Sequence, residues 1–127
     1  MLKRLLFFYA LFLVLIIILA DSGQAIFFFS TLAQIPWGDK IGHFFLMGVM
    51  AYLLTLATNA ERLTICGKSL MKGPFWLAVV VTLEEISQIW LANRGFSLWD
   101  LGFDYLGIIA FSYLALVQLS KNPSGTI

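Results

Sequence analysis

The chain has 127 residues, of which 61% are hydrophobic and only 12% charged, whereas a soluble domain usually carries about 25% charged residues. This length allows one domain, and a water-soluble fold of this size cannot hide so much apolar surface, so we expect a membrane protein whose main partner is the lipid bilayer. The net charge of +1 argues against nucleic-acid binding through the phosphate backbone. The single cysteine, Cys66, excludes an intramolecular disulfide and a CxxC metal ribbon.

The first candidate span, residues 3–20, opens with Lys3 and Arg4 and continues as an unbroken apolar run. The apolar part would cover about 24 Å as a helix at 1.5 Å per residue, which is short for a hydrocarbon core of roughly 30 Å. The polar stretch that begins at Asp21 is also compatible with a signal peptide cleaved after Ala25. A retained helix and a cleaved leader are therefore both open.

The segment IFFFSTLAQIPWGDK, residues 26–40, is too short to cross a membrane and too apolar to be simply hydrated. Its aromatic side chains, among them Phe27 and Trp37, suit the depth of the lipid headgroups. We interpret it as a short interfacial element; an ordinary loop with a hydrophobic anchor is the alternative.

Three further apolar runs cover residues 41–58, 74–92 and 101–119, each close to the roughly 20 residues that a spanning helix needs. Backbone groups in lipid must be satisfied within their own segment, so these runs are predicted to be helices. The predicted fold is an all-α, polytopic membrane helical bundle. It has four transmembrane helices, an interfacial segment between helices 1 and 2, and a single domain, 1–127.

Basic residues divide unequally between the two sides of such a bundle. One side collects six of them: Lys3, Arg4, Arg62, Lys68, Lys72 and Lys121. The other side collects two, Lys40 and Arg94. The positive-inside rule then places both termini and the 59–73 loop in the cytoplasm, with residues 21–40 and 93–99 facing outward. This orientation holds whether or not the first run is cleaved.

The strongly polar residues within or beside the spans all fall on the predicted outer side. They are Asp39, Lys40, His43, Glu84, Glu85, Gln88, Arg94, Asp100 and Asp104. A carboxylate inside the bilayer costs roughly 2.5–3.5 kcal/mol, so such groups normally face the bundle interior and find partners. We expect Glu85, on the helical face of Gln88, to enter the cluster, and Glu84 to be protonated or turned toward Thr82 and the neighbouring helix.

Such a cluster can be a binding or catalytic site, or its hydrogen bonds between helices can serve only to fix how the helices pack. His43 as a metal ligand would need three further donors, which Asp39, Glu85 and Asp100 could supply. The spacing does not demand this, and we predict neither a metal ion nor a cofactor.

Several short motifs follow one another along the chain: Asp39-Lys40-Ile41-Gly42-His43-Phe44, Glu85-Ile86-Ser87-Gln88, Arg94-Gly95-Phe96-Ser97-Leu98-Trp99-Asp100, and Gly107. At these spacings the set resembles the VanZ-like family of bacterial membrane proteins over residues 37–107, most of the chain. The family usually has asparagine where this chain has Asp104. An amide donates and accepts hydrogen bonds, whereas an ionised carboxylate only accepts, which puts any role needing the donor in doubt.

The resemblance implies a multi-pass protein of the bacterial cell (inner) membrane; the founding member is linked to low-level resistance to the glycopeptide teicoplanin. On this basis we expect a cell-envelope protein with an outward polar pocket, linked to glycopeptide resistance or to envelope homeostasis. Lys40 and Arg94 would hold an anionic group of an envelope lipid, a peptide or an antibiotic, and His43 and Gln88 would orient it.

Two other functions stay open. An integral-membrane hydrolase or transferase acting on a lipid headgroup would use Glu85 or His43 as general base and Arg94 to stabilise negative charge. A proton-coupled carrier would use the Glu84 and Glu85 pair, but no inverted repeat is visible in the sequence, which disfavours it. Neither the ligand nor the oligomeric state follows from the sequence.

Overall fold

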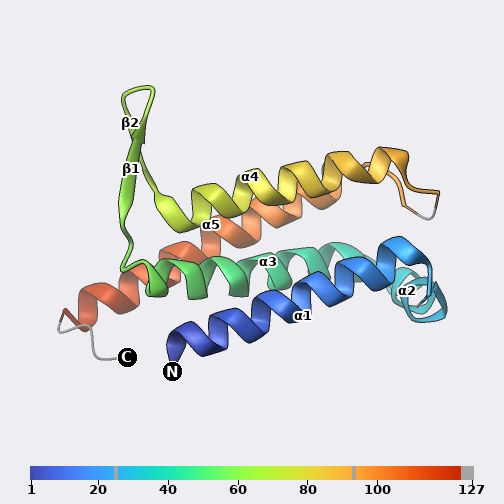
Figure 1. The fold of residues 1–127 in the computed structure, drawn as a ribbon, viewed down its shortest axis with the longest axis horizontal. Coiled ribbons are helices and arrows are strands. Elements are labelled where there is room, and N and C mark those ends of the chain that lie inside the picture. The colour runs from blue at the N-terminus through green and yellow to red at the C-terminus, as the bar shows by residue number, and fades with distance from the viewer. Residues whose placement is uncertain (25, 93, 124–127) are drawn as a thin grey trace.

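A computed structural model describes residues 1–24, 26–92 and 94–123, which fold into a mostly helical bundle (Figure 1). The described elements are α1 (Leu2–Ser22), α2 (Ile26–Ala33), α3 (Gly38–Ala57), β1 (Arg62–Ile65), β2 (Lys68–Met71), α4 (Lys72–Ser87), the 3-10 helix η1 (Gln88–Trp90) and α5 (Leu98–Lys121). Ala25, the predicted cleavage position, and Asn93 lie outside the described residues.

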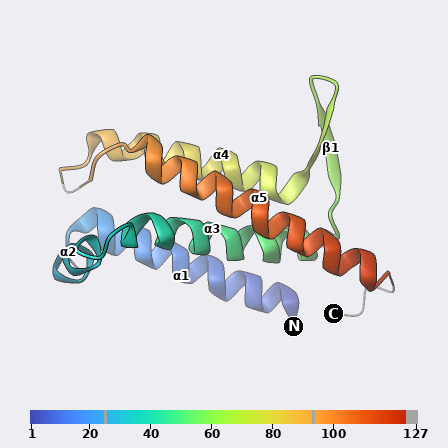
Figure 2. The ribbon, with the colours of Figure 1, turned by 180° about the vertical axis from the view of Figure 1, so that it is seen from behind.

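The four long helices α1, α3, α4 and α5 lie alongside one another and alternate in direction (Figures 1 and 2). At one end, which we call the polar end, the last turn of α1, helix α2, the first turns of α3 and α5, and η1 come together. The opposite end, which we call the hairpin end, holds the start of α1, strands β1 and β2, and the last turn of α5. Within the described ranges, α1, α3 and α5 are long and apolar enough to cross a membrane.

The outward surface of the bundle is apolar along the long helices. Phe8 of α1, Val80 of α4 and Ile109 of α5 are 65%, 59% and 67% exposed. The inner core is small and includes Leu13 and Ala51. Lipid chains solvate such a surface as well as a protein core would, whereas water would not, so the distribution of apolar side chains is that of a membrane protein.

Helices α3 and α5 make the closest contact in the bundle, because glycines lie where they cross. A Cβ added at Gly107 would lie 2.1 Å from the carbonyl oxygen of Phe44, and one added at Gly48 would lie 2.5 Å from the ring of Phe111. Small residues at a crossing let two helix backbones approach, which is how helices associate without a hydrophobic driving force. The contact at Gly107 also sets which residues of α3 and α5 face each other at the polar end.

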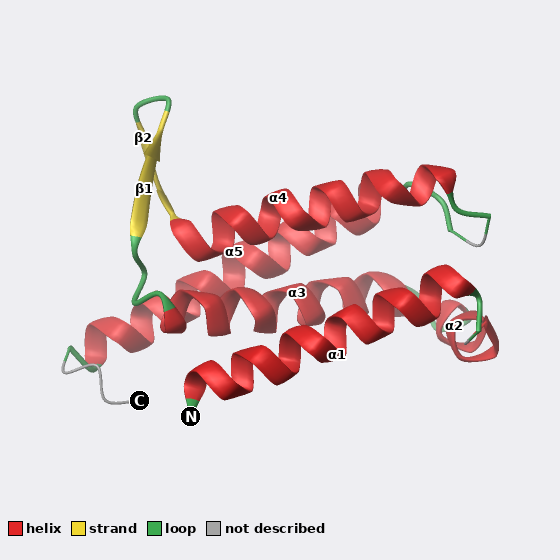
Figure 3. Cartoon of the chain, viewed as in Figure 1, coloured by secondary structure: helices red, strands yellow, loops and turns green. Residues whose placement is uncertain are grey.

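The prediction of an all-α chain is wrong in the 59–73 connection, which contains a two-stranded antiparallel sheet (Figure 3). Arg62 pairs with Met71, and Ile65 pairs with Lys68. Cys66 and Gly67 between the strands have φ angles of 51° and 77°. Positive φ at both central residues is what a two-residue hairpin turn of the favoured hand requires.

Two helices begin three residues before the predicted spans, and both differences affect the polar end. Helix α3 starts at Gly38, which places Asp39 and Lys40 in its first turn. Helix α5 starts at Leu98 because the Ser97 hydroxyl caps it, accepting a hydrogen bond from the backbone N–H of Asp100. The predicted interfacial segment forms helix α2, in which no residue is buried.

Candidate functional site

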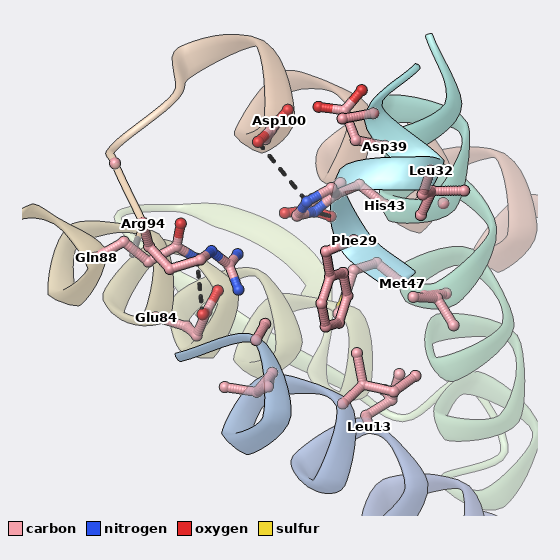
Figure 4. A pocket seen from close by; sticks show the side chains of 18 of the residues that line it. Leu13, Phe29, Leu32, Asp39, His43, Met47, Glu84, Gln88, Arg94 and Asp100 are labelled. Carbon is pink, nitrogen blue, oxygen red and sulfur yellow. Dashed lines mark hydrogen bonds and ion pairs between the residues drawn. The ribbon is translucent and has the colours of Figure 1, made fainter. Parts of the chain in front are cut away.

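A cavity of about 420 Å³ lies at the polar end, among α1, α2, α3, α4, η1 and α5 (Figure 4). Apolar side chains of α1, α2 and α3 line one part, including Leu13, Ile17, Phe29 and Met47. Polar side chains line the other part. Seven of the nine predicted site residues are among them: Asp39, His43, Glu84, Gln88, Arg94, Asp100 and Asp104.

His43 lies between two carboxylates of α5. Its Nδ1 is 2.9 Å from Oδ1 of Asp104, a hydrogen-bonding distance, and its Nε2 is 3.7 Å from Oδ2 of Asp100, the approach drawn in Figure 4. Asp100 and Asp104 are one helical turn apart, so both reach the same side of α3. With Asp104 ionised, Nδ1 of His43 is the donor in this pair.

Lys40, one turn before His43 on α3, is not part of the cavity lining. Its Nζ donates to Oδ2 of Asp39 at 3.0 Å and to Oδ1 of Asp100 at 3.3 Å. The ammonium therefore neutralises carboxylates at the starts of α3 and α5. The role expected for Lys40 from the sequence, holding an anionic ligand, would rest on the third N–H donor of the ammonium, because two are already used.

The two glutamates of α4 have different surroundings: Glu84 lines the cavity, whereas Glu85 is buried and does not line it. Glu84 lines the cavity, where its Oε1 accepts a hydrogen bond of 2.7 Å from Nε2 of Gln88 (Figure 4). Thr82, the partner considered for Glu84, instead bonds to Tyr105 and to the Ala78 carbonyl.

Glu85 is fully buried behind the lining. Its Oε1 accepts a 2.8 Å hydrogen bond from the backbone N–H of Ser97. The chain that follows η1 folds back over this side of α4, so Glu85 meets the N-terminus of α5, where unpaired N–H groups carry partial positive charge. Its Oε2 has no hydrogen-bond partner among the described residues. Glu85 thus holds the start of α5 in place instead of facing the cavity.

Arg94 joins the connection before α5 to the first helix. Its guanidinium is 3.4 Å from Oδ1 of Asp21, in the last turn of α1. The sequence analysis treated Asp21 only as the flank of the first apolar run and so missed it. The available signal was its position: Asp21 is predicted on the same side of the membrane as Arg94.

The described residues offer little support for metal binding or covalent catalysis at this site. They contain no group of three or more His, Cys, Asp or Glu side chains placed to hold a metal ion. In the same part of the chain, no Ser, Thr or Cys side chain lies within hydrogen-bonding distance of His43. Cys66 lies in the turn at the hairpin end. The described side chains of the site form ion pairs and hydrogen bonds around a cavity.

Comparison of the chain with known protein families, with curated proteins and with solved structures finds no match. The VanZ-like resemblance of the motifs therefore stays a prediction, and the geometry of the polar end carries the functional argument.

Proposed function

We propose that the protein is a VanZ-like, four-span protein of the bacterial inner membrane whose outward-facing cavity binds a group of the cell envelope. The observation that carries this proposal is the cavity itself. A volume of about 420 Å³ lies within the range of small-molecule sites. If these polar side chains served only to hold the helices together, they would fill the space between them, and here they line a cavity.

Helix α4 is the proposed fourth span. Its 16 residues continue into the three of η1, and together they cover about 30 Å. Trp76, Val80 and Leu83, at spacings of four and three residues, are 55%, 59% and 62% exposed and form one apolar stripe. A stripe of this kind facing away from the bundle fits contact with lipid.

The polar end is proposed to face outward. Six of the eight Lys and Arg residues belong to the opposite, hairpin end, as the positive-inside rule expects of the cytoplasmic side: Lys3, Arg4, Arg62, Lys68, Lys72 and Lys121. Trp37, Trp90 and Trp99 are 57%, 76% and 68% exposed at the polar end, which suits an aromatic belt at headgroup depth. The retained first helix is supported by Tyr9, whose hydroxyl donates to the Leu46 carbonyl of α3 at 2.8 Å.

The alternative function is a hydrolase or transferase acting on an envelope lipid headgroup. One observation favours it: Asp104 holds the imidazole of His43 by a 2.9 Å bond, as a carboxylate orients a general base. Water would serve as the nucleophile of a hydrolase, and the acceptor molecule would serve as the nucleophile of a transferase. Glu85 is poorly suited as the base, because it lies behind the cavity lining and bonds to Ser97.

The orientation is tested with a membrane-impermeant maleimide on intact cells. Cys66 should stay unlabelled until the membrane is permeabilised. Gly95→Cys, placed in a Cys66→Ser background, should be labelled at once, since Gly95 lines the cavity and has no atom within 4 Å of an added Cβ. Labelling of Cys66 together with protection at position 95 would reverse the proposed topology.

The function is tested by filling the cavity. Gly42 lines it, and neither Gly42 nor Gly102 has an atom within 4 Å of an added Cβ. Gly42→Leu should abolish the tolerance to a teicoplanin-type glycopeptide that expression of the wild type confers, while Gly102→Leu, on the exposed side of α5, should retain it. If wild type and empty vector give equal tolerance, the resistance role is wrong. If both variants match wild type, the cavity is not the site.

A further inference from the structure

The two parts of the cavity differ in chemistry, and this division indicates the kind of molecule that fits. Ile16 and Ile17 of α1 and Phe29 and Leu32 of α2 supply an apolar wall. Polar side chains at the starts of α3 and α5, at the end of α4, in η1 and before α5 supply the opposite wall (Figure 4). Most of them are acidic or amide groups, and His43 and Arg94 are the basic ones. A ligand that fills both parts has an apolar tail and a polar head.

The fixed cations at the polar end are already engaged. Lys40 bonds to Asp39 and Asp100, and Arg94 pairs with Asp21. An anionic head would have only the N–H donors that these bonds leave free, and it would lie among the carboxylates that already pair with both cations.

Carboxylates are in excess over cations at this end. Six of the seven acidic residues of the chain belong to it: Asp21, Asp39, Glu84, Glu85, Asp100 and Asp104. Only two of the eight Lys and Arg residues do, Lys40 and Arg94. Counted with every carboxylate ionised and His43 neutral, carboxylates outnumber cations six to two at the polar end. A cationic head would reduce this repulsion, and an anionic head would add to it.

Two lining carboxylates keep an oxygen without a partner. Asp104 is only 2% exposed, and its Oδ1 is bonded to His43, but its Oδ2 accepts no hydrogen bond from any described residue. Oε2 of Glu84 is likewise without a donor within the described ranges. Neither oxygen is among the buried side-chain atoms without a partner in the described part of the chain, so both are open to the cavity, where a donor of a ligand can reach them. An ammonium group brings up to three donors and no acceptor, which matches these oxygens.

We propose that the cavity binds an amphiphile that has an apolar tail and a cationic, amine-bearing head, with the head between Asp104 and Glu84 and the tail along α1 and α2. This inference rests on the proposed binding function and names the ligand class. The same head chemistry can come from a membrane lipid or from an amphiphile that arrives from the water.

The test uses the full chain in phosphatidylcholine nanodiscs and three probes with the same tail: dodecylamine, dodecanol and dodecanoate. Dodecylamine should bind at least about tenfold more tightly than dodecanoate, since each charge-assisted hydrogen bond accounts for about a tenfold change in affinity or more. Glu84→Gln and Asp104→Asn should each weaken dodecylamine about tenfold and leave dodecanol unchanged. An amide side chain can still accept the hydrogen bonds from Gln88 and His43, so the bundle should stay folded.

Glu61→Gln is the matched control. Glu61 is an exposed carboxylate at the hairpin end that pairs with Lys72, so its loss changes the net charge equally without touching the cavity. Dodecanoate binding as tightly as dodecylamine, or dodecylamine binding unchanged by Glu84→Gln relative to Glu61→Gln, overturns the amine head.

Gly42→Leu separates this failure from failure of the proposed function. If all three probes bind equally and Gly42→Leu abolishes them, the binding function stands and only the head chemistry is wrong. If no probe responds to Gly42→Leu, both proposals fail. Mass spectrometry of lipid that copurifies from native membranes identifies the source: enrichment of amine-bearing lipid indicates the bilayer, and no enrichment indicates a water-borne amphiphile.

Discussion

Gly107→Ala should destabilise the bundle, because the added methyl group would clash with the backbone of α3. It should also disturb the polar site, although Gly107 does not line the cavity. Its Cβ would lie 2.1 Å from the carbonyl oxygen of Phe44 and 2.9 Å from the carbonyl carbon. Both are backbone atoms within helix α3, so no side-chain rotation relieves the clash. The helices must part by about 1.3 Å, the difference between 2.1 Å and the 3.4 Å at which ordinary contact begins.

This separation falls one turn from the site. The bond between Nδ1 of His43 and Oδ1 of Asp104 is 2.9 Å long and joins the same two helices. An opening of that size takes it past the roughly 3.2 Å limit of a good hydrogen bond. Overpacking of this kind costs about 1–3 kcal/mol. Because the hydrogen bond between His43 and Asp104 is weakened as well, we expect the free energy of unfolding to fall by about 3 kcal/mol.

The measurement is reversible unfolding in mixed micelles with a rising mole fraction of sodium dodecyl sulfate, followed by far-ultraviolet circular dichroism. Gly102→Ala is the matched control, since Gly102 lies in the same helix with no atom within 4 Å of an added Cβ. It should gain up to about 1 kcal/mol, because alanine favours the helix over glycine. Equal stability of the two variants would refute the close contact between α3 and α5.

Three further variants test single contacts by the same unfolding measurement. Tyr9→Phe should lose about 1 kcal/mol, because α1 then lacks its hydrogen bond to the Leu46 carbonyl; no loss would mean that α1 is not docked on α3. Ser97→Ala should also cost about 1 kcal/mol, through the lost cap of α5, and an unchanged midpoint would argue against the cap. Asp21→Asn should cost less than about 1 kcal/mol, since its pair with Arg94 is partly exposed, and the cost should vanish in an Arg94→Ala background.

Hydropathy located the four long helices because apolar runs of nearly 20 residues are typical of membrane-spanning helices and are rare in soluble proteins. The predicted segments 3–20, 41–58, 74–92 and 101–119 all fall on helices, with boundaries that differ by a few residues. The hairpin was missed because its strands are only four residues each. A signal was present in the Cys66-Gly67 dipeptide between two short β-prone runs, since glycine readily adopts positive φ.

Asp100 and Asp104 are four residues apart, a spacing that places both on one face of a helix, and in the structure both approach His43. Spacing could not decide between Glu84 and Glu85. Adjacent residues on a helix point about 100° apart, so the choice depends on how α4 is rotated against its neighbours. That rotation is set by the chain after η1, which covers Glu85 with the backbone of Ser97.

The sequence by itself determined three things: that the chain belongs in a membrane, which residues form the long helices, and where polar side chains occur along them. All three depend on composition and on local periodicity. Only the tertiary structure decided what those polar groups face. Lys40 and Arg94 were expected to receive an anion, yet carboxylates from other helices already pair with both. Partners of this kind lie 60 to 73 residues away along the chain, and no local pattern specifies them. The approach of α3 to α5 at Gly107 brings His43 to Asp104, and the placement of α1 beside the α4–α5 connection brings Asp21 to Arg94.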